Sequence, residues 1–265
     1  MSEPEEIDLN KPNAARVYDY YLGGDHNFAV DRAMGDDAIR MWPELPLIMQ
    51  ANRAFLRRAV HYCVDQGIRQ FLDLGSGIPT VGNVHEVAQL AAPDSRVVYV
   101  DTDPVAVAYS RTLLEGNDQA SIVRADVRDP EAVLNSPEVA EQLDLDEPVA
   151  LMMVALLHFV DDEANPREVI TRYRDALAPG SYLAISHATD EGRPDLADEH
   201  ADLYRKRTST PMTMRSRARI NEFFEGFELV EPGLVYMPQW RPVSPSEIDD
   251  NPERFTALVG VGRKL

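Results

Sequence analysis

The chain has 265 residues, and 44% of them are hydrophobic, which suffices for a sizeable core and is too many for a disordered chain. Its 26 basic and 45 acidic residues give a net charge of −19, which disfavours nucleic-acid and anionic-membrane partners. Cys63 is the only cysteine, so we expect no internal disulfide and no thiolate metal cluster, and no metal site is predicted.

The amino-terminal stretch is polar and does not look like a targeting signal. "MSEPEEIDLNKP", residues 1–12, is acidic and lacks the apolar centre of a signal peptide. The longest apolar run, "VALMMVALL" at 149–157, is too short to span a bilayer. These features predict a cytoplasmic protein.

Three helices are expected before the first strand. "ARVYDYYL" stops at Gly23-Gly24, and residues 27–42 and 51–67 follow, with Gly67 as the final cap. No strand pattern occurs before residue 68. The chain is therefore divided into an amino-terminal helical extension, residues 1–67, and a main domain, residues 68–265.

From residue 68, strand and helix patterns alternate. Strands are expected at 69–74, 96–101, 121–126, 148–157 and 181–188, and helices at 83–92, 104–115, 130–142 and 166–178. A helix at 215–226 and two strands at 227–232 and 254–265 complete the chain. The pattern predicts an α/β fold with a doubly wound, mostly parallel, seven-stranded sheet. The apolar run 149–157 suits a central strand buried on both faces, although a buried helix is an alternative.

A glycine turn, "FLDLGSGIPT" at 71–80, follows the first expected strand. The turn lacks the third glycine of a dinucleotide-binding turn, and the next helix starts late, at the expected cap Asn83. Asp101, the next strand-ending acid, lies farther away than the usual spacing of about 20 residues. The turn alone could hold a pyrophosphate, hold another cofactor, or serve only as a tight connection.

Polar residues follow the later strands as well. Asp101 could accept the hydroxyls of a ribose, Asp126 could take the amino group of an adenine, and His158 comes just after the fourth strand. Each could also be an ordinary cap or turn residue, as Asp103 before Pro104 is expected to be. Because parallel strands place their carboxyl ends at one edge, these positions together favour one shared ligand site.

The motifs "DLGSG", "YVDTDP", "RADV" and "ALLHFVDD", in this order, resemble those of class I S-adenosylmethionine-dependent methyltransferases. The closer resemblance is to an actinobacterial family called the S-adenosyl methyltransferases, whose substrate is unknown. It is carried by "ARVYDYYLGGDHNFAVDR", "GIPTVGNVHEVAQ" and "FFEGFELVEPGLV" and extends from about Asn10 to Leu265. The long turn departs from the wider superfamily but agrees with this family.

The resemblance implies that residues 68–265 bind S-adenosylmethionine. Asp73 would lie near its ammonium group, Asp101 would take the ribose, and the carbonyl of Ala155 would face the methionine part. The implied cofactor-binding residues are Asp73, Gly75, Ser76, Gly77, Asp101, Thr102, Asp126, Val127, Ala155 and Asn27.

Methyl transfer mainly requires alignment of donor and acceptor, with a base only where the acceptor loses a proton. His158 is the candidate base and His187 a second one, although both could be packing residues. The expected acceptor is an unidentified small molecule. The alternatives are a catalytically silent S-adenosylmethionine-binding protein and a nicotinamide-dependent oxidoreductase; against the latter count the missing glycine and the absence of a Tyr-x-x-x-Lys-like proton donor.

Two further segments have open interpretations. Residues 20–32 could form a lid in which Arg16 or Asn27 meets the cofactor carboxylate, or only a helix–helix turn. The stretch 205–219 has six basic residues and no acidic one, and could bind an acidic molecule or form solvated helix ends. Tyr236 and Trp240 could wall the same pocket or pack in the core.

Overall fold

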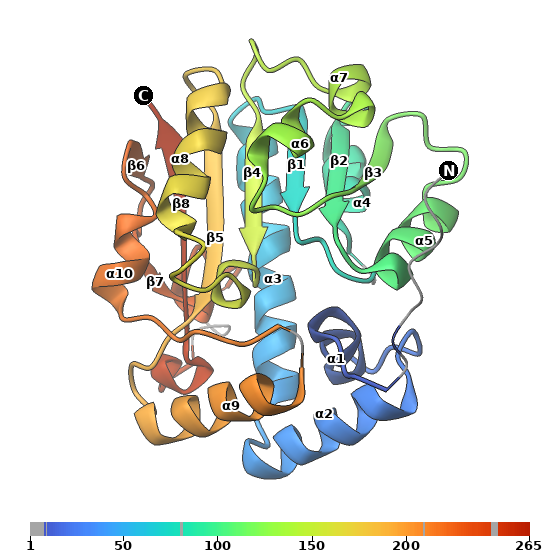
Figure 1. Ribbon diagram of the computed structural model, residues 1–265. Coiled ribbons are helices and arrows are strands. Elements are labelled where there is room, and N and C mark those ends of the chain that lie inside the picture. Colours follow the sequence, from blue (N-terminus) through green and yellow to red (C-terminus); the bar gives the residue numbers. More distant parts are fainter. Residues whose placement is uncertain (1–7, 9, 80–81, 209, 245–248) are drawn as a thin grey trace.

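A computed structural model describes residues 8, 10–79, 82–208, 210–244 and 249–265, and shows a central sheet flanked by helices (Figure 1). The strands follow the order β3–β2–β1–β4–β5–β8–β6, and a short β7 pairs with β8. The first five strands are parallel, and β8 runs antiparallel between β5 and β6. Their bounds are β1 Gln70–Leu74, β2 Arg96–Asp101, β3 Ala120–Arg124, β4 Ala150–Val154, β5 Tyr182–Ala188, β6 Phe227–Leu229, β7 Val235–Tyr236 and β8 Ala257–Lys264.

The predicted α/β fold with a mostly parallel sheet is confirmed. The path of the sheet contains the seven expected strands, and β7 is an addition that the sequence did not indicate. The apolar run 149–157 does contain a central strand, but β4 ends at Val154. Ala155 then takes a left-handed conformation with φ 57°, and a short 3₁₀ helix, η1, spans Leu157–Phe159. The last residues of this run therefore form a turn at the edge of the sheet.

Helices cover both faces of the sheet. The helices α3, α4 and α5 pack against one face, while α6, α7 and α8 pack against the other, together with Phe223 and Phe224 just after α10. Their bounds are α1 Ala14–Tyr21, α2 Ala29–Met41, α3 Leu45–Asp65, α4 Val84–Ala91, α5 Pro104–Leu113, α6 Pro130–Leu134, α7 Pro137–Gln142, α8 Pro166–Ala176, α9 Pro194–Arg207 and α10 Arg217–Glu222.

Several helices differ from the prediction for local reasons. The helix α3 starts six residues earlier than expected, with Pro46 in its first turn, where the missing amide of proline costs nothing. The predicted helix 130–142 is divided into α6 and α7, because Ser136 caps a new helix that begins at Pro137. The helix α9 was not predicted.

The helices α1, α2 and α9 lie together beyond the carboxyl ends of the parallel strands, as Figure 1 shows. Asp37 of α2 forms an ion pair with Arg207 at the end of α9. We call these three helices the cap. Because α9 comes from the second half of the chain, the cap combines distant segments; the boundary between residues 67 and 68 remains a prediction. Among the described residues, the structure contains no helix with the length and hydropathy of a membrane span.

Candidate active site

A cavity of about 310 Å³ lies where the strand order reverses between β1 and β4, at the carboxyl ends of the strands. Its volume lies within the range of small-molecule sites. Every predicted cofactor-binding residue except Asn27 lines it. Those residues are Asp73, Gly75, Ser76, Gly77, Asp101, Thr102, Asp126, Val127 and Ala155. We call this space the outer cavity.

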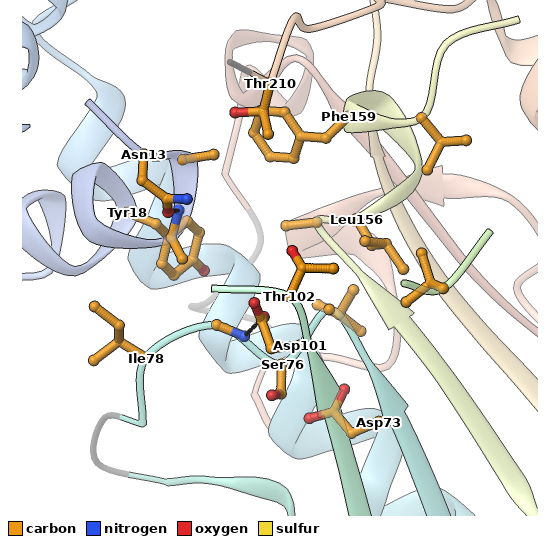
Figure 2. Close-up of a pocket in the computed structure, with 18 of the residues that line it drawn as sticks. Asn13, Tyr18, Asp73, Ser76, Ile78, Asp101, Thr102, Leu156, Phe159 and Thr210 are labelled. Atoms are coloured by element: carbon orange, nitrogen blue, oxygen red, sulfur yellow. Dashed lines mark hydrogen bonds between the residues drawn. The ribbon is translucent and has the colours of Figure 1, made fainter. Parts of the chain in front are cut away.

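Figure 2 shows how the outer cavity is built. Asp73, Ser76 and Asp101 lie at the strand ends. Asn13 and Tyr18 approach from α1, and Leu156, Phe159 and Thr210 lie across from them. The cap thus supplies one wall and the loop after β4 supplies another.

The backbone amides of the glycine turn donate hydrogen bonds to other groups of the protein. The amides of Gly75 and Ser76 both donate to the carbonyl of Val100, at 2.8 and 3.1 Å, and the amide of Gly77 donates to Oδ2 of Asp101 at 2.7 Å. Both glycines have φ near +66°, and a Cβ on Gly75 would lie 2.4 Å from Leu156. The turn therefore requires glycine, yet these three amides are already used and are not open to a phosphate.

The amides at the start of α4 also have a partner within the protein, the side chain of Glu86. Oε2 of Glu86 accepts hydrogen bonds from the amides of Gly82 and Asn83, at 2.7 and 2.8 Å. This is the acidic half of the predicted capping box. A pyrophosphate would have to displace this carboxylate from the helix amino terminus, so the geometry disfavours a dinucleotide.

Asp73 and Arg53 bring opposite charges to the outer cavity. The Asp73 carboxyl is buried, and it makes no hydrogen bond to any residue that the structure describes. Burial raises its pKa to about 7; the nearby Arg53 opposes this shift and Asp101 adds to it. Arg53 donates from Nη2 to the carbonyl of Gly82 at 2.9 Å, while its buried Nε lacks a partner among the described residues. The pair suits a ligand with an ammonium and a carboxylate.

Asp101 and Asp103 have separate tasks. Oδ1 of Asp101 accepts from the amide of Asp103 at 2.8 Å, and burial raises the pKa of Asp101 despite its backbone hydrogen bonds. Asp103 caps α5, accepting from the amides of Val105 and Ala106 at 2.8 and 3.0 Å. The predicted capping role of Asp103 is confirmed, and only Asp101 of the two lines the outer cavity.

At the end of β3, Asp126 already has a partner. Arg128 donates to it from Nε at 2.9 Å and from Nη2 at 2.5 Å, and these bonds lower the pKa of Asp126. The hydroxyl of Tyr173 on α8 donates to the carbonyl of Val127 at 3.1 Å and helps to fix the position of this turn. An adenine bound here would share the Asp126 carboxylate with Arg128.

A smaller cavity of about 60 Å³ adjoins the first one; we call it the inner cavity. His158 lines the inner cavity and not the outer one, and burial lowers its pKa well below the usual range. Five of the described residues line both spaces and mark their junction: Ala14, Tyr18, Asn52, Ala155 and Phe159.

His187 has both ring nitrogens engaged. Nδ1 lies 2.6 Å from the carbonyl of Ala188 and Nε2 lies 2.8 Å from Nη1 of Arg215. Since Arg215 can only donate, Nε2 accepts and the proton is on Nδ1. Burial lowers the pKa of His187 to about 3. These contacts make His187 a structural link and a poor base.

A hydrogen-bond network that the sequence analysis missed lies at the junction. Nδ2 of Asn52 donates to the hydroxyl of Tyr18 at 2.8 Å, and Oγ of Ser186 donates to Oδ1 of Asn52 at 2.6 Å. The same Ser186 oxygen accepts from the amide of Ala155 at 2.8 Å, which supports its left-handed backbone. The available signal was Asn52 itself, a polar residue in the apolar stripe of α3 that includes Ile48 and Phe55.

Asn27 and Arg16 do not line either cavity. Nδ2 of Asn27 donates to Oδ2 of Asp19 and to the carbonyl of Gly24, both at 2.8 Å. A Cβ on Gly24 would lie 2.0 Å from Asp19, so this glycine permits the chain to fold around that carboxylate. Residues 20–32 thus include a helix–helix turn around Asp19. Among the described residues of the cap helices, those of α1 line the outer cavity.

The basic stretch 205–219 does not form an anion site in either cavity, because none of its six basic residues lines them. Its arginines pair with acids, as Arg217 does with Glu191. Arg215 is buried and donates to the carbonyls of Leu157 and Val160 at 2.8 and 2.7 Å, so it fixes the loop that carries His158. Trp240 is fully buried in the core.

Known proteins share the sequence and the fold of this chain. A family profile described as S-adenosyl methyltransferase matches residues 1–265. A structure of a candidate methyltransferase from Thermobifida fusca YX has 43% identity and a TM-score of 0.92, covering 100% of this chain and 99% of that one. A DUF574 family protein from Streptomyces avermitilis MA-4680 has 43% identity and a TM-score of 0.94, covering 98% and 100%.

More distant structures share the fold alone. An O-methyltransferase family protein from Burkholderia thailandensis has 14% identity and a TM-score of 0.52, covering 96% of this chain and 64% of its own. A search among functionally curated proteins found no match.

Proposed function

The chain belongs to the S-adenosyl methyltransferase family, an S-adenosylmethionine-dependent methyltransferase family, and from this premise we propose that it methylates a small molecule. The observation that carries the proposal is the contrast within the outer cavity. The turn amides are used internally, while the Asp73 carboxylate has no hydrogen-bond partner among the described residues. Such a site suits an ammonium group and offers little to a phosphate.

The residues of the outer cavity fit the parts of S-adenosylmethionine. Asp73 would hold the ammonium and Arg53 the carboxylate, replacing Arg16 and Asn27 in that role. Asp101 with Thr102 would hold the ribose, while Asp126 and Val127 would meet the adenine. Gly75, Ser76 and Gly77 would allow close approach, and the carbonyl of Ala155 would face the methionine chain.

When bound, S-adenosylmethionine supplies an electrophilic methyl group on a positively charged sulfur. The task of this chain is then to hold donor and acceptor in line and to exclude water. The junction between the cavities offers such a position, because Tyr18, Asn52 and Ala155 line both spaces and are fixed by one hydrogen-bond network. His158 lies on the acceptor side and would take the acceptor proton where one is lost.

The amino-terminal segment 1–67 is proposed to act as a lid. Support comes from the N-cap Asn13 and from Ala14, Ala15 and Tyr18 of α1, which line the outer cavity. Residues 68–265 would hold the ribose, the adenine and the ammonium of the cofactor, while Arg53 and Asn52 come from α3 in the amino-terminal segment. Deleting residues 1–30 should then leave a folded protein with much weaker cofactor binding.

Calorimetry tests the donor assignment. We expect S-adenosylmethionine and S-adenosylhomocysteine to bind, and NAD and NADP to bind far more weakly. Equal binding of a nicotinamide cofactor would contradict the proposal. Incubation with labelled S-adenosylmethionine and a metabolite extract, followed by mass spectrometry, tests transfer; cofactor binding without transfer would favour a silent binding protein.

A further inference from the structure

The inner cavity contains polar atoms that the protein leaves unsatisfied. Nε1 of Trp42 and Nε2 of His200 are buried and have no hydrogen-bond partner among the described residues. Both side chains line the inner cavity, and Trp42 is 1% and His200 4% exposed. Their rings meet edge to face with centroids 5.6 Å apart. Unsatisfied buried polar groups are costly, which makes a ligand oxygen at this place favourable.

The remaining wall is apolar and adaptable. It includes four methionines, Met49, Met212, Met214 and Met237, together with Phe159 and Tyr204. Methionine side chains change rotamer easily, so a space of about 60 Å³ can enlarge around a small ring. No Asp, Glu, Lys or Arg is among the described residues that line it.

The ionisable groups in this wall are neutral near pH 7. Burial lowers the pKa of His187 to about 3 and that of His200 to about 4, and it raises the pKa of Tyr204 to about 12. A charged acceptor would lose its hydration here without meeting an opposite charge.

Resting on the proposed methyl transfer, we infer that the inner cavity is the acceptor site and that it selects an uncharged, ring-containing small molecule with an oxygen held by Trp42 and His200. The donor cavity and the acceptor cavity meet at Tyr18, Asn52 and Ala155, so the far end of the acceptor points toward the methyl group. Trp42 Nε1 is a donor only, and therefore requires an accepting oxygen.

Phenol is the probe, because it combines a neutral ring with one hydroxyl. The chain has two tryptophans, so an ¹H–¹⁵N spectrum contains two indole signals, which Trp42→Phe and Trp240→Phe assign. Trp240 is the matched control, since its Nε1 is also buried without a partner among the described residues but it does not line the inner cavity. With S-adenosylhomocysteine bound, phenol should shift the Trp42 signal and leave that of Trp240 in place.

The variants and the analogues decide the outcome. Trp42→Phe should weaken phenol binding about fivefold, the scale of one neutral hydrogen bond, whereas Trp240→Phe should not. Toluene should bind more weakly than phenol, and benzoate should not compete with it. An unmoved Trp42 signal at saturating phenol, or benzoate binding as strong as phenol binding, would overturn the inference. Failure of S-adenosylhomocysteine to bind would instead overturn the proposed function.

Discussion

Arg16 of α1 forms a buried ion pair with Asp103 at the start of α5. Nη1 of Arg16 lies 3.3 Å from Oδ2 of Asp103, and both side chains are almost fully buried. The same guanidinium donates from Nε to Asp31 of α2 at 2.9 Å. One buried cation therefore connects two helices of the cap to the edge of the sheet, next to the outer cavity.

Asp103→Ala should lower the free energy of unfolding by about 2–4 kcal/mol, because it removes a helix cap and one partner of a buried cation. Urea unfolding measures the change. Asp129→Ala is the control: Asp129 caps α6 on the surface through a single bond to the amide of Ala132, so its loss should cost about 1 kcal/mol. Equal costs would mean that the Arg16 pair contributes nothing.

Asp101→Ala should weaken S-adenosylhomocysteine binding by about 1.5–3 kcal/mol, the range for hydrogen bonds to a charged group. Calorimetry gives the affinity. Asp103→Ala should leave the affinity nearly unchanged, because Asp103 does not line the outer cavity. If Asp103→Ala lost the affinity and Asp101→Ala kept it, the ribose assignment would be wrong.

Asp73→Asn should stabilise the free protein while it weakens cofactor binding. The folded-state pKa of Asp73 is raised to about 7, so the folded protein retains a proton that the unfolded chain loses near pH 4. Stability therefore falls as the pH rises from about 4 to 7. Because Asn does not ionise, the stability of the variant does not fall in this pH range. Its free energy of unfolding should exceed that of the parent by about 2–4 kcal/mol at pH 8 and differ little at pH 4. A variant that is less stable at pH 8 would refute this.

Cofactor binding should also depend on pH through Asp73. A bound ammonium favours the ionised carboxylate, so affinity should rise as the pH increases through 7, with release of a proton on binding. Calorimetry in buffers of different ionisation enthalpy detects that proton. Asp73→Asn should abolish both the slope and the proton release.

Arg53→Leu should separate the two ends of the cofactor. It should weaken S-adenosylhomocysteine binding about 10- to 100-fold, as expected for a lost charge-assisted contact, and leave 5′-methylthioadenosine binding unchanged, because that compound lacks the amino-acid end. Arg57→Leu is the control, since Arg57 lies one helical turn away, is exposed and does not line the outer cavity. Equal losses for both ligands would exclude a contact with the carboxylate.

Gly75→Ala should destabilise the protein more than Gly77→Ala. Both positions have left-handed backbones, which cost an alanine about 1–2 kcal/mol. Only at Gly75 does the new Cβ collide with a side chain, that of Leu156, adding about 1–3 kcal/mol. Thermal unfolding should rank the variants, and Leu156→Ala should recover part of the Gly75→Ala loss. A Gly77→Ala variant of equal or greater cost would contradict this ranking.

The strand-end residues were predictable because they depend on short-range patterns. Asp73, Asp101 and Asp126 lie within two residues of the end of an apolar strand, and parallel strands bring such ends to one edge. Arg53 was not predictable in this way. Its position depends on how α3 packs on the sheet, which brings its side chain to the outer cavity beside Asp73.

The helix α9 was missed for a different reason. Its buried residues, Ala197, His200, Ala201 and Tyr204, do recur with helical spacing, but two are small and two have polar groups. These residues are buried because α9 packs beside α2 and borders the inner cavity. No local sequence pattern reveals that packing. In residues 20–32, a double glycine and polar side chains are compatible with either a hinged lid or a helix–helix turn. The structure shows that these groups form a turn around Asp19, and the lid stays a prediction.

The mixed origin of the cap has a consequence for how the protein is made on the ribosome. The helices α1 and α2 leave the ribosome early. The ion pair of Arg16 cannot form until Asp103 has been synthesised, and that of Asp37 cannot form until Arg207 has been synthesised. Contacts between such distant residues form late, since a long loop must close first. The wall of the inner cavity, which includes His200 and Tyr204 of α9, is therefore completed only after α9 has left the exit tunnel.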